Sequence, residues 1–379
     1  MVTPREVIQR LSEEIGPRFG GTESEHRAAY WLRDAMEAAG LSVRLQRYGF
    51  IGWVPSGKPS VRLVAPIQSE LPSAPVIYSA STPTEGVKGR VLRHGTKHLI
   101  SGLYELEAFS VLDESGDIAA QLLVEPSGRA IPLLNPAPIF RLPLVVISAE
   151  AGSMLTKLLQ RGADVLAEVH IQTQLVPDSH SYNVIGEYRG APSTTKRIVV
   201  DAHYDTQLDT PGAYDNASGV AGLFALAERV RGTRLPINID FVAVASEEIG
   251  MHGSSYLVMD LVERGDLENV SFCICFDQIS GGDTLWLWVG PDGVREKVVR
   301  SAHAANLGRL GPIRVDAPMP GCDMWPFYQK GVPGCLYMWW RLPAYHKLED
   351  TIDKVDMAKL HGCVEAAYLL LKDLIEDRR

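Results

Sequence analysis

The sequence predicts an α/β protein with a mixed, largely parallel β-sheet, helices on both faces, and a small β-rich inserted domain. Three observations carry this prediction. Expected strands and helices alternate after residue 181, which is typical of strands joined by helices. Runs such as 237–245 are almost unbroken in their apolar character, which indicates strands buried on both faces. Between 53 and 180 the chain changes to short alternating runs separated by prolines and turn signals.

The N-terminal residues predict two helices and a strand. Residues 3–6 (TPRE) form a capping box with proline at the first helical position. A second helix is expected after Thr22, with Glu25 completing its cap and Gly40 ending it. Residues 41–48 alternate with period two, as a half-buried strand does.

The segment 53–180 has the character of a separate domain. It contains short strands and a helix expected at 150–161, and it holds no cluster of His, Asp and Glu that would support chemistry of its own. Its run PLVVISAEAG…LLQRGADV resembles a protease-associated domain. We therefore expect residues 1–52 and 181–379 to form one domain, and 53–180 to form an inserted protease-associated-like domain.

The rest of the chain supplies the main sheet. The strands are expected at 182–188, 197–202, 237–245, 270–276 and 335–340, and the helices at 217–231, 252–264 and 355–375.

Charge and composition exclude several classes of protein. The net charge of −9 and the lack of a dense Lys/Arg run argue against a nucleic-acid or membrane partner. No apolar run is long enough to span a bilayer, and the N-terminus lacks the pattern of a secretory signal. The five cysteines lack the spacing of a zinc ribbon and suit reduced, buried thiols. We expect a cytoplasmic protein.

Four of the expected strands are followed by side chains that bind metals. These are His203 and Asp205 with Asp215 in the next loop, then Glu247 and Glu248, then Asp277, and finally His346. The carboxyl ends of strands in an open α/β sheet converge on one crevice, so these residues can meet. Imidazoles and carboxylates suit zinc or another borderline divalent ion. A shared carboxylate can hold two such ions about 3.5–4 Å apart.

The motifs HYD, YDNASG, SEEIG, FDQ and AYHKLEDT, in this order, resemble the M28 family of zinc aminopeptidases and carboxypeptidases. The resemblance covers residues 183–379 and, through the two N-terminal helices, residues 1–50. It implies the zinc exopeptidase fold and a cis peptide bond after the bridging aspartate. In Gly321-Cys322-Asp323-Met324, Asp323 matches the Ser-Asp-His turn that the family often carries, whereas Cys322 and Met324 depart from it. The departure bears on the substrate contact of this loop and not on the metal site.

The resemblance also implies a role for each residue. Asp215 would bridge two zinc ions, with cobalt or manganese as other possible metals. His203 and Glu248 would complete one metal site, and Asp277 and His346 the other. Glu247 would be the general base. On physical grounds, Asp205 can accept the N–H of His203 and fix the tautomer that binds the metal.

The resulting expectation is a two-zinc exopeptidase acting on peptide substrates, and most directly an aminopeptidase. A carboxypeptidase of the same family is the first alternative; it would need a cation for the substrate carboxylate, and Arg314 and Arg341 are candidates. A glutaminyl-cyclase-like acyltransferase with one zinc is the second, although the presence of His203 counts against it. A catalytically inactive binding domain is the third. Whether the chain forms a homo-oligomer is left open.

Overall fold

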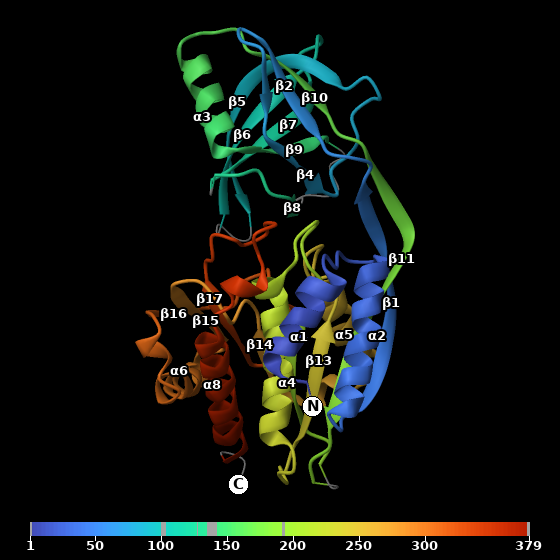
Figure 1. Cartoon of the computed structure of the whole chain (residues 1–379), viewed down its shortest axis with the longest axis vertical. Helices are drawn as coiled ribbons and strands as arrows, with labels where there is room; N and C mark the ends of the chain where they lie inside the picture. The colour runs from blue at the N-terminus through green and yellow to red at the C-terminus, as the bar shows by residue number, and fades with distance from the viewer. Residues whose placement is uncertain (1, 100–103, 127, 135–141, 192–193, 377–379) are drawn as a thin grey trace. The chain divides into compact units, whose positions relative to one another are not determined.

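The structure, a computed structural model, describes residues 2–99, 104–126, 128–134, 142–191 and 194–376 (Figure 1). The chain forms two compact units. Unit 1 comprises Met1–Phe50 and His180–Arg379, and unit 2 comprises Ile51–Ser179.

Unit 1 is built on a mixed eight-stranded sheet. Its strands, in spatial order, are β1 (Ser42–Pro55), β11 (Thr173–Tyr188), β13 (Asn238–Val244), β12 (Arg197–His203), β14 (Val270–Phe276), β17 (Gly334–Trp340), β15 (Thr284–Gly290) and β16 (Ile313–Asp316). The four central strands, β13, β12, β14 and β17, are parallel to one another. β11 and β15 run antiparallel to their inner neighbours. The predicted mixed, largely parallel sheet is confirmed.

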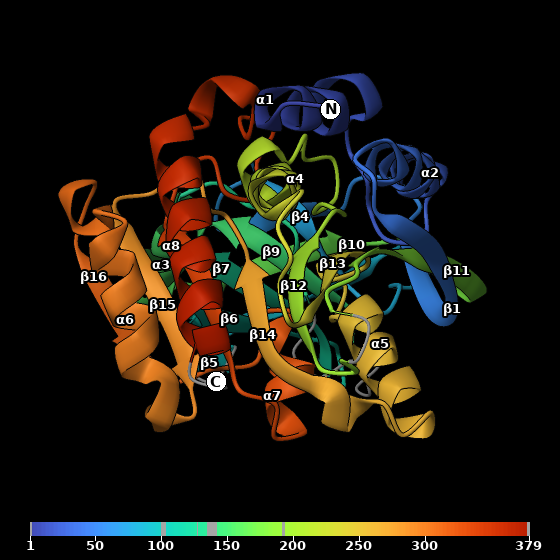
Figure 2. The ribbon, with the colours of Figure 1, turned by 90° about the horizontal axis from the view of Figure 1, so that it is seen from below.

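Helices cover both faces of this sheet. They are α1 (Pro4–Gln9), α2 (Glu23–Ala38), α4 (Ser218–Val230), α5 (His252–Glu263), α6 (Arg295–Ala304), α7 (Met324–Gln329) and α8 (Met357–Glu376). Figure 2 shows α4 and α8 on one side of the sheet and α5 and α7 on the other. The expected capping box starts α1, because Thr3 Oγ1 accepts from the main-chain N–H of Glu6 and the Glu6 carboxylate accepts from that of Thr3.

The sequence does not predict β15, α6, β16 or α7. Short apolar runs and amphipathic stretches of this length are ambiguous between helix, strand and loop. In the folded chain, β15 pairs with β17 along its whole length, and this long-range pairing decides its conformation.

Unit 2 has its own sheet and core. Its strands, in spatial order, are β3 (Ser69–Leu71), β2 (Ser60–Ala65), β10 (Leu166–His170), β5 (Val87–Leu99), β6 (Tyr104–Leu112), β7 (Ile118–Glu125), β9 (Leu144–Ser148), β4 (Ser73–Ile77) and β8 (Leu133–Leu134). Its helix α3 (Ala149–Gln160) packs Ala151 and Leu155 into a buried apolar cluster with the strands. The apolar run before α3 forms β9, as the sequence of residues 141–148 suggests, although residue 141 lies outside the described residues. The resemblance to a protease-associated domain stays a prediction.

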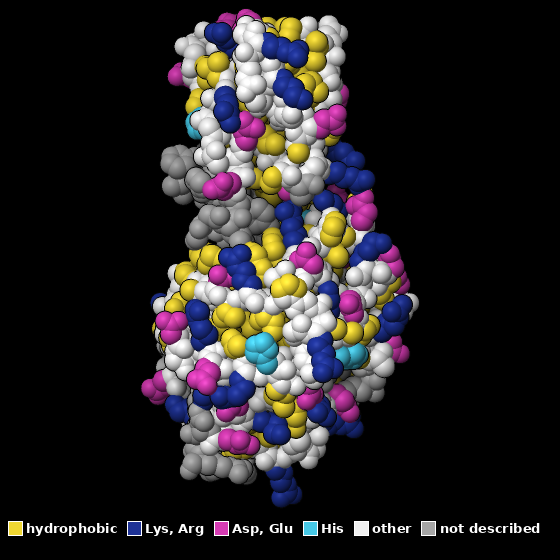
Figure 3. Space-filling view, turned by 90° about the vertical axis from the view of Figure 1, so that its left-hand side faces the viewer, with side chains coloured by type: hydrophobic (Ala, Val, Ile, Leu, Met, Phe, Trp, Pro, Cys, Tyr) yellow, Lys and Arg dark blue, Asp and Glu magenta, His cyan; other side chains and the backbone are white. Residues whose placement is uncertain are grey.

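Two observations concern nucleic-acid and membrane partners. On the face shown in Figure 3, the described Lys and Arg side chains are interspersed with Asp and Glu and form no continuous basic patch. None of the described helices is long and apolar enough to cross a membrane.

Candidate metal centre

The predicted ligands gather at one edge of the unit 1 sheet. The central strands β13, β12, β14 and β17 are parallel neighbours, so their carboxyl ends meet at that edge. The residues follow those ends in turn: Glu247 and Glu248 after β13, His203 at the end of β12 with Asp205 just beyond, Asp277 after β14, and His346 in the loop after β17.

Asp215 lies in the segment between β12 and α4 and contacts both histidines. Its Oδ1 is 3.2 Å from Nε2 of His203, and its Oδ2 is 3.2 Å from Nε2 of His346. The peptide bond from Asp215 to Asn216 is cis. One carboxylate therefore presents a different oxygen to each of two neighbouring positions.

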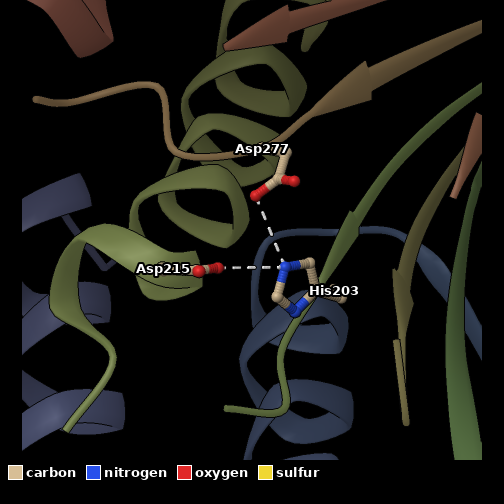
Figure 4. A group of neighbouring side chains, drawn as sticks. All are labelled: His203, Asp215 and Asp277. Carbon is tan, nitrogen blue, oxygen red and sulfur yellow. Dashed lines mark ion pairs between the residues drawn. The ribbon is translucent and has the colours of Figure 1, made fainter. Parts of the chain in front are cut away.

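The ligands form two groups that share Asp215. His203, Asp215 and Asp277 make one group, and Asp215, Glu248 and His346 make the other; within each, the ligand atoms lie within 4.8 Å of one another. Nε2 of His203 is 3.4 Å from Oδ1 of Asp277 (Figure 4), and Nε2 of His346 is 3.2 Å from Oε2 of Glu248.

This grouping corrects the expected pairing of the ligands. His203 shares its group with Asp277 rather than Glu248, and Glu248 shares its group with His346. Because β12 lies between β13 and β14, strand order alone allows His203 to meet a ligand from either strand. Asp277 is the first residue after β14 and lies close to the end of β12. Glu248 lies beyond the end of β13, after a turn in which Ser246 has a φ of 56°, and its side chain reaches His346.

The chemistry of this cluster suits divalent cations. All five ligand side chains are buried or nearly so, His346 being the most exposed at 11%. Oδ1 of Asp215, Oε1 of Glu248 and Oδ1 of Asp277 receive no hydrogen bond from any described residue. Buried carboxylates without donors resist ionising together unless positive charge lies among them. The residues present therefore fit two metal ions with oxygen and nitrogen ligands.

In the metal-free chain the histidines supply that positive charge. Burial alone would lower the pKa of His203, but the carboxylates of Asp205, Asp215 and Asp277 around its ring raise this pKa well above the ordinary value. Burial likewise opposes ionisation of His346, while Glu248 and Asp215 raise its pKa to about 10. Because a histidine ligates as the neutral imidazole, metal binding at this centre must release protons.

Asp205 connects the end of β12 to the end of β13. The main-chain N–H of Glu247 donates to its Oδ1 and that of Glu248 to its Oδ2, each at 3.1 Å. Its Oδ1 is also 3.5 Å from Nδ1 of His203. Asp205 thus lies where it can orient both the imidazole and the two glutamates.

Glu247 is in neither ligand group, although it adjoins Glu248. It is half-buried at the edge of the centre. Burial, together with the charges of Asp323, Glu248 and Asp277, raises its pKa well above the ordinary value. A carboxyl group beside a metal centre whose pKa is shifted by burial and neighbouring charges is a candidate for proton transfer.

Comparison with known protein families identifies the family of this chain. The model of peptidase family M28 matches residues 183–371. The chain belongs to peptidase family M28. It is a hydrolase, and the expected resemblance is confirmed.

Three relatives illustrate the relationship. Aminopeptidase YwaD of Bacillus subtilis is 25% identical to this M28 member, over 93% of this chain and 80% of YwaD. Carboxypeptidase Q of Bos taurus is 21% identical over 94% of this chain and 82% of its own. The solved structure of BSAP, a zinc aminopeptidase from Bacillus subtilis, matches with a TM-score of 0.74 at 19% identity, covering 98% of this chain and 94% of that one. This structural match confirms the fold.

Asp350 and Asn216 support the bridging residue. Asp350 is buried and accepts from the main-chain N–H groups of Tyr214 (2.7 Å) and Asp215 (3.0 Å). The Asn216 side chain donates to the carbonyl of Phe276 at 2.9 Å and so ties this segment to the end of β14.

Sequence reasoning missed four polar residues around the centre: Arg18, Glu25, Gln207 and Gln278. Gln278 donates to Oδ2 of Asp215 and Gln207 to Oε2 of Glu248, each at 3.3 Å. Arg18 and Glu25 are fully buried and contact the ends of β12 and β13. Gln278 adjoins a predicted ligand, which is a usable signal, whereas the partners of Arg18 and Glu25 lie far away in sequence.

Three further sets of residues differ in how close they lie to the centre. The ring of Tyr345 stacks on His346 with centroids 3.6 Å apart. Cys322, Asp323 and Met324 are buried at the start of α7. Asp209 is exposed and lies outside both ligand groups.

Proposed function

We propose that this M28 member is a two-zinc aminopeptidase that removes N-terminal residues from peptides. The observation that carries the proposal is the Asp215 carboxylate, which offers one oxygen to each of two ligand groups. Two relatives support it, since YwaD is named an aminopeptidase and BSAP a zinc aminopeptidase.

The residues of the centre divide the chemistry between them. His203 and Asp277 would hold one ion, Glu248 and His346 the other, and Asp215 both. When bound, the two ions would polarise the scissile carbonyl and lower the pKa of the attacking water. Asp205 keeps the imidazole of His203 and the Glu247–Glu248 backbone in place.

Glu247 is the proposed proton carrier. Its carboxylate accepts a proton from the attacking water as the oxygen bonds to the carbonyl carbon. The carbon–nitrogen bond then breaks, and Glu247 returns the proton to the departing amine. Its position beside the ligands, and outside both ligand groups, leaves it available for this role.

The end of the peptide that is cleaved can be tested directly. Zinc-loaded protein is assayed with one peptide sequence in three forms: free, N-acetylated, and amidated at its C-terminus. The proposal expects cleavage of the free and C-amidated forms, with the N-terminal residue released first. Release of the C-terminal residue from the N-acetylated form would contradict an aminopeptidase.

A carboxypeptidase is the second candidate, because one of the expected cations lies near the centre. Arg341 lies over the rings of Trp340 (5.7 Å) and Tyr345 (5.5 Å), and Tyr345 stacks on His346. Arg314 is paired with Asp316 at 2.5 Å. If the chain is a carboxypeptidase, Arg341→Gln will raise KM for N-acetylated peptides, whereas Arg314→Gln will not.

The glutaminyl-cyclase-like and inactive alternatives predict different metal contents and products. A one-zinc acyltransferase would cyclise N-terminal glutamine and bind one ion per chain. An inactive domain would release no amino acid from any of the three peptides. The presence of His203 in a complete ligand group favours the hydrolase.

A further inference from the structure

Arg18 is a charged side chain with no surface exposure that lies behind the proposed metal centre. It lies in the segment Gly16-Pro17-Arg18, which follows the π-helical turn Arg10–Ile15 at the end of α1. We propose that Arg18 is a positioning residue: its guanidinium fixes the loop between His203 and Asp215 in the conformation that binds metal. The inference rests on the proposed function, because it presumes that these two residues are ligands.

The guanidinium bonds to main-chain carbonyls at both ends of this loop. Nε donates to the carbonyl of Tyr204 at 2.7 Å, which lies between His203 and Asp205. Nη1 donates to Pro211 at 2.9 Å and Nη2 to Gly212 at 3.1 Å. The planar guanidinium group of one side chain thus bonds to the loop both just after His203 and just before Asp215.

The same side chain anchors the loop to the N-terminal segment. Nη1 also donates to the carbonyls of Leu11 (2.6 Å) and Gly16 (2.7 Å). The main-chain N–H of Arg18 donates to Oγ1 of Thr206 at 2.9 Å, and the N–H of Thr206 returns a bond to the carbonyl of Arg18 at 3.2 Å. The loop is therefore held to the segment through side-chain and main-chain bonds.

Gly212 shows how closely the guanidinium group approaches the loop. A Cβ added there would lie 3.0 Å from Nη2 of Arg18 and 2.2 Å from Cγ2 of Thr206, and the φ of Gly212 is 67°. The loop turns toward Asp215 at this residue, and the backbone needs both the left-handed conformation and the missing side chain.

The positive charge of Arg18 is compensated by the acidic centre as a whole rather than by an ion pair with one of the described carboxylates. The described residues give its guanidinium five carbonyl acceptors and no carboxylate in contact. The negative charges that act on it are those of Asp205, Asp350 and Asp215. A buried cation needs such compensation, so Arg18 and the acidic centre stabilise one another.

The test compares metal binding in three variants of the full chain. Arg18→Gln removes both the positive charge and the planar guanidinium group. Arg18→Lys keeps the positive charge, but its ammonium group cannot bond to both ends of the loop. Arg197→Gln is the matched control, since Arg197 starts the same strand β12 at its opposite end and pairs with Asp240 (3.2 Å) and Asp266 (3.0 Å). Zinc dissociation constants are measured by chelator competition and the cobalt(II) absorption spectrum is recorded, on protein shown to be folded by circular dichroism.

Loss of a residue that orients metal ligands typically weakens metal binding about 10–100-fold. We expect both Arg18 variants to show a loss of that size, with an altered cobalt spectrum and with the ion of the His203 group removed first. Arg197→Gln should unfold at a lower temperature but bind zinc like the wild type. Wild-type affinities and an unchanged spectrum in Arg18→Gln would overturn the inference.

Two further outcomes are decisive. If the Arg18 variants do not fold without metal, they are refolded with excess zinc: recovery supports the inference, and failure at every zinc concentration contradicts it by showing a general structural role. If the wild type itself does not bind two ions, the proposed function fails, and that result is separate from the behaviour of Arg18.

Discussion

Glu247 and Glu248 are adjacent in the sequence but differ in their surroundings. Glu248 contacts His346 within a ligand group, whereas Glu247 lies outside both groups and is half-buried. Asp205 accepts from the main-chain N–H of each, which holds the two residues in one conformation. Adjacent carboxyl groups can therefore serve different purposes, one as ligand and one as base.

Glu247→Gln tests this division. The amide cannot accept the proton of the attacking water, so we expect the kcat for peptide cleavage to fall about 10²–10⁴-fold. Zinc content should stay that of the wild type, because the residue is in neither ligand group. Glu263→Gln, at an exposed position at the end of α5, is the control. Full activity in a zinc-loaded Glu247→Gln protein would refute the assignment of the base.

The histidines predict how zinc binding depends on pH. The pKa of His346 is raised to about 10 in the metal-free chain, so its imidazole is protonated at neutral pH and must lose that proton to ligate. Zinc affinity should therefore increase as the pH rises from about 6 to 8, by about tenfold per pH unit for each proton released. Calorimetry in buffers of different ionisation enthalpy measures that proton count, and a binding enthalpy that is the same in every buffer would contradict the prediction.

At the scale of elements, the turns that follow the strands decide which of the proposed ligands meet. The sequence points to the five proposed ligands from their place after expected strands, because a histidine or carboxylate at a strand end needs no tertiary information to be noticed. It does not reveal the turn after β13 that places Glu248 beside His346, and so it pairs His203 with Glu248 instead of Asp277. Local patterns likewise leave β15 undetected, since its partner β17 lies about fifty residues further along the chain.

The start of α2 is tied to the end of β13 by a buried carboxyl group. Glu25 accepts from the main-chain N–H of Gly21 at 2.6 Å and from the hydroxyl of Ser246 at 3.1 Å. Glu25→Ala leaves these buried donors unpaired, so we expect the free energy of unfolding to fall by about 1–3 kcal/mol. Urea unfolding measures it, with Glu23→Ala, an exposed residue in the same first turn, as the control. Equal effects of the two substitutions would show that the buried contacts are unimportant.

At the scale of the whole molecule, each unit has its own sheet and its own buried core. All five proposed ligands and Glu247 belong to unit 1. The chain leads into unit 2 from β1 and returns through β11, and these two strands are neighbours in the sheet of unit 1. We therefore expect the strands that carry the proposed ligands, and their core, to withstand the removal of residues 51–179. Composition and turn signals suffice to suggest such a division, whereas the order of nine strands in unit 2 depends on long-range pairing that no local pattern records.

A shortened chain tests the independence of unit 1. Residues 51–179 are replaced by a short Gly/Ser turn that joins Phe50 to His180. We expect the product to fold and to bind zinc with the stoichiometry of the full chain, and the excised segment alone to fold without binding zinc. Circular dichroism and metal analysis check both. An unfolded or zinc-free unit 1 would contradict the prediction.

The central claim is that Asp215 joins two metal positions, and the number of zinc ions per chain tests it most directly. Metal-free protein is titrated with zinc, and bound zinc is quantified by elemental analysis while peptide cleavage is followed in the same samples. We predict saturation at two ions per chain, with full cleavage reached only when the second ion is bound. Saturation at one ion, with full activity, would contradict the claim.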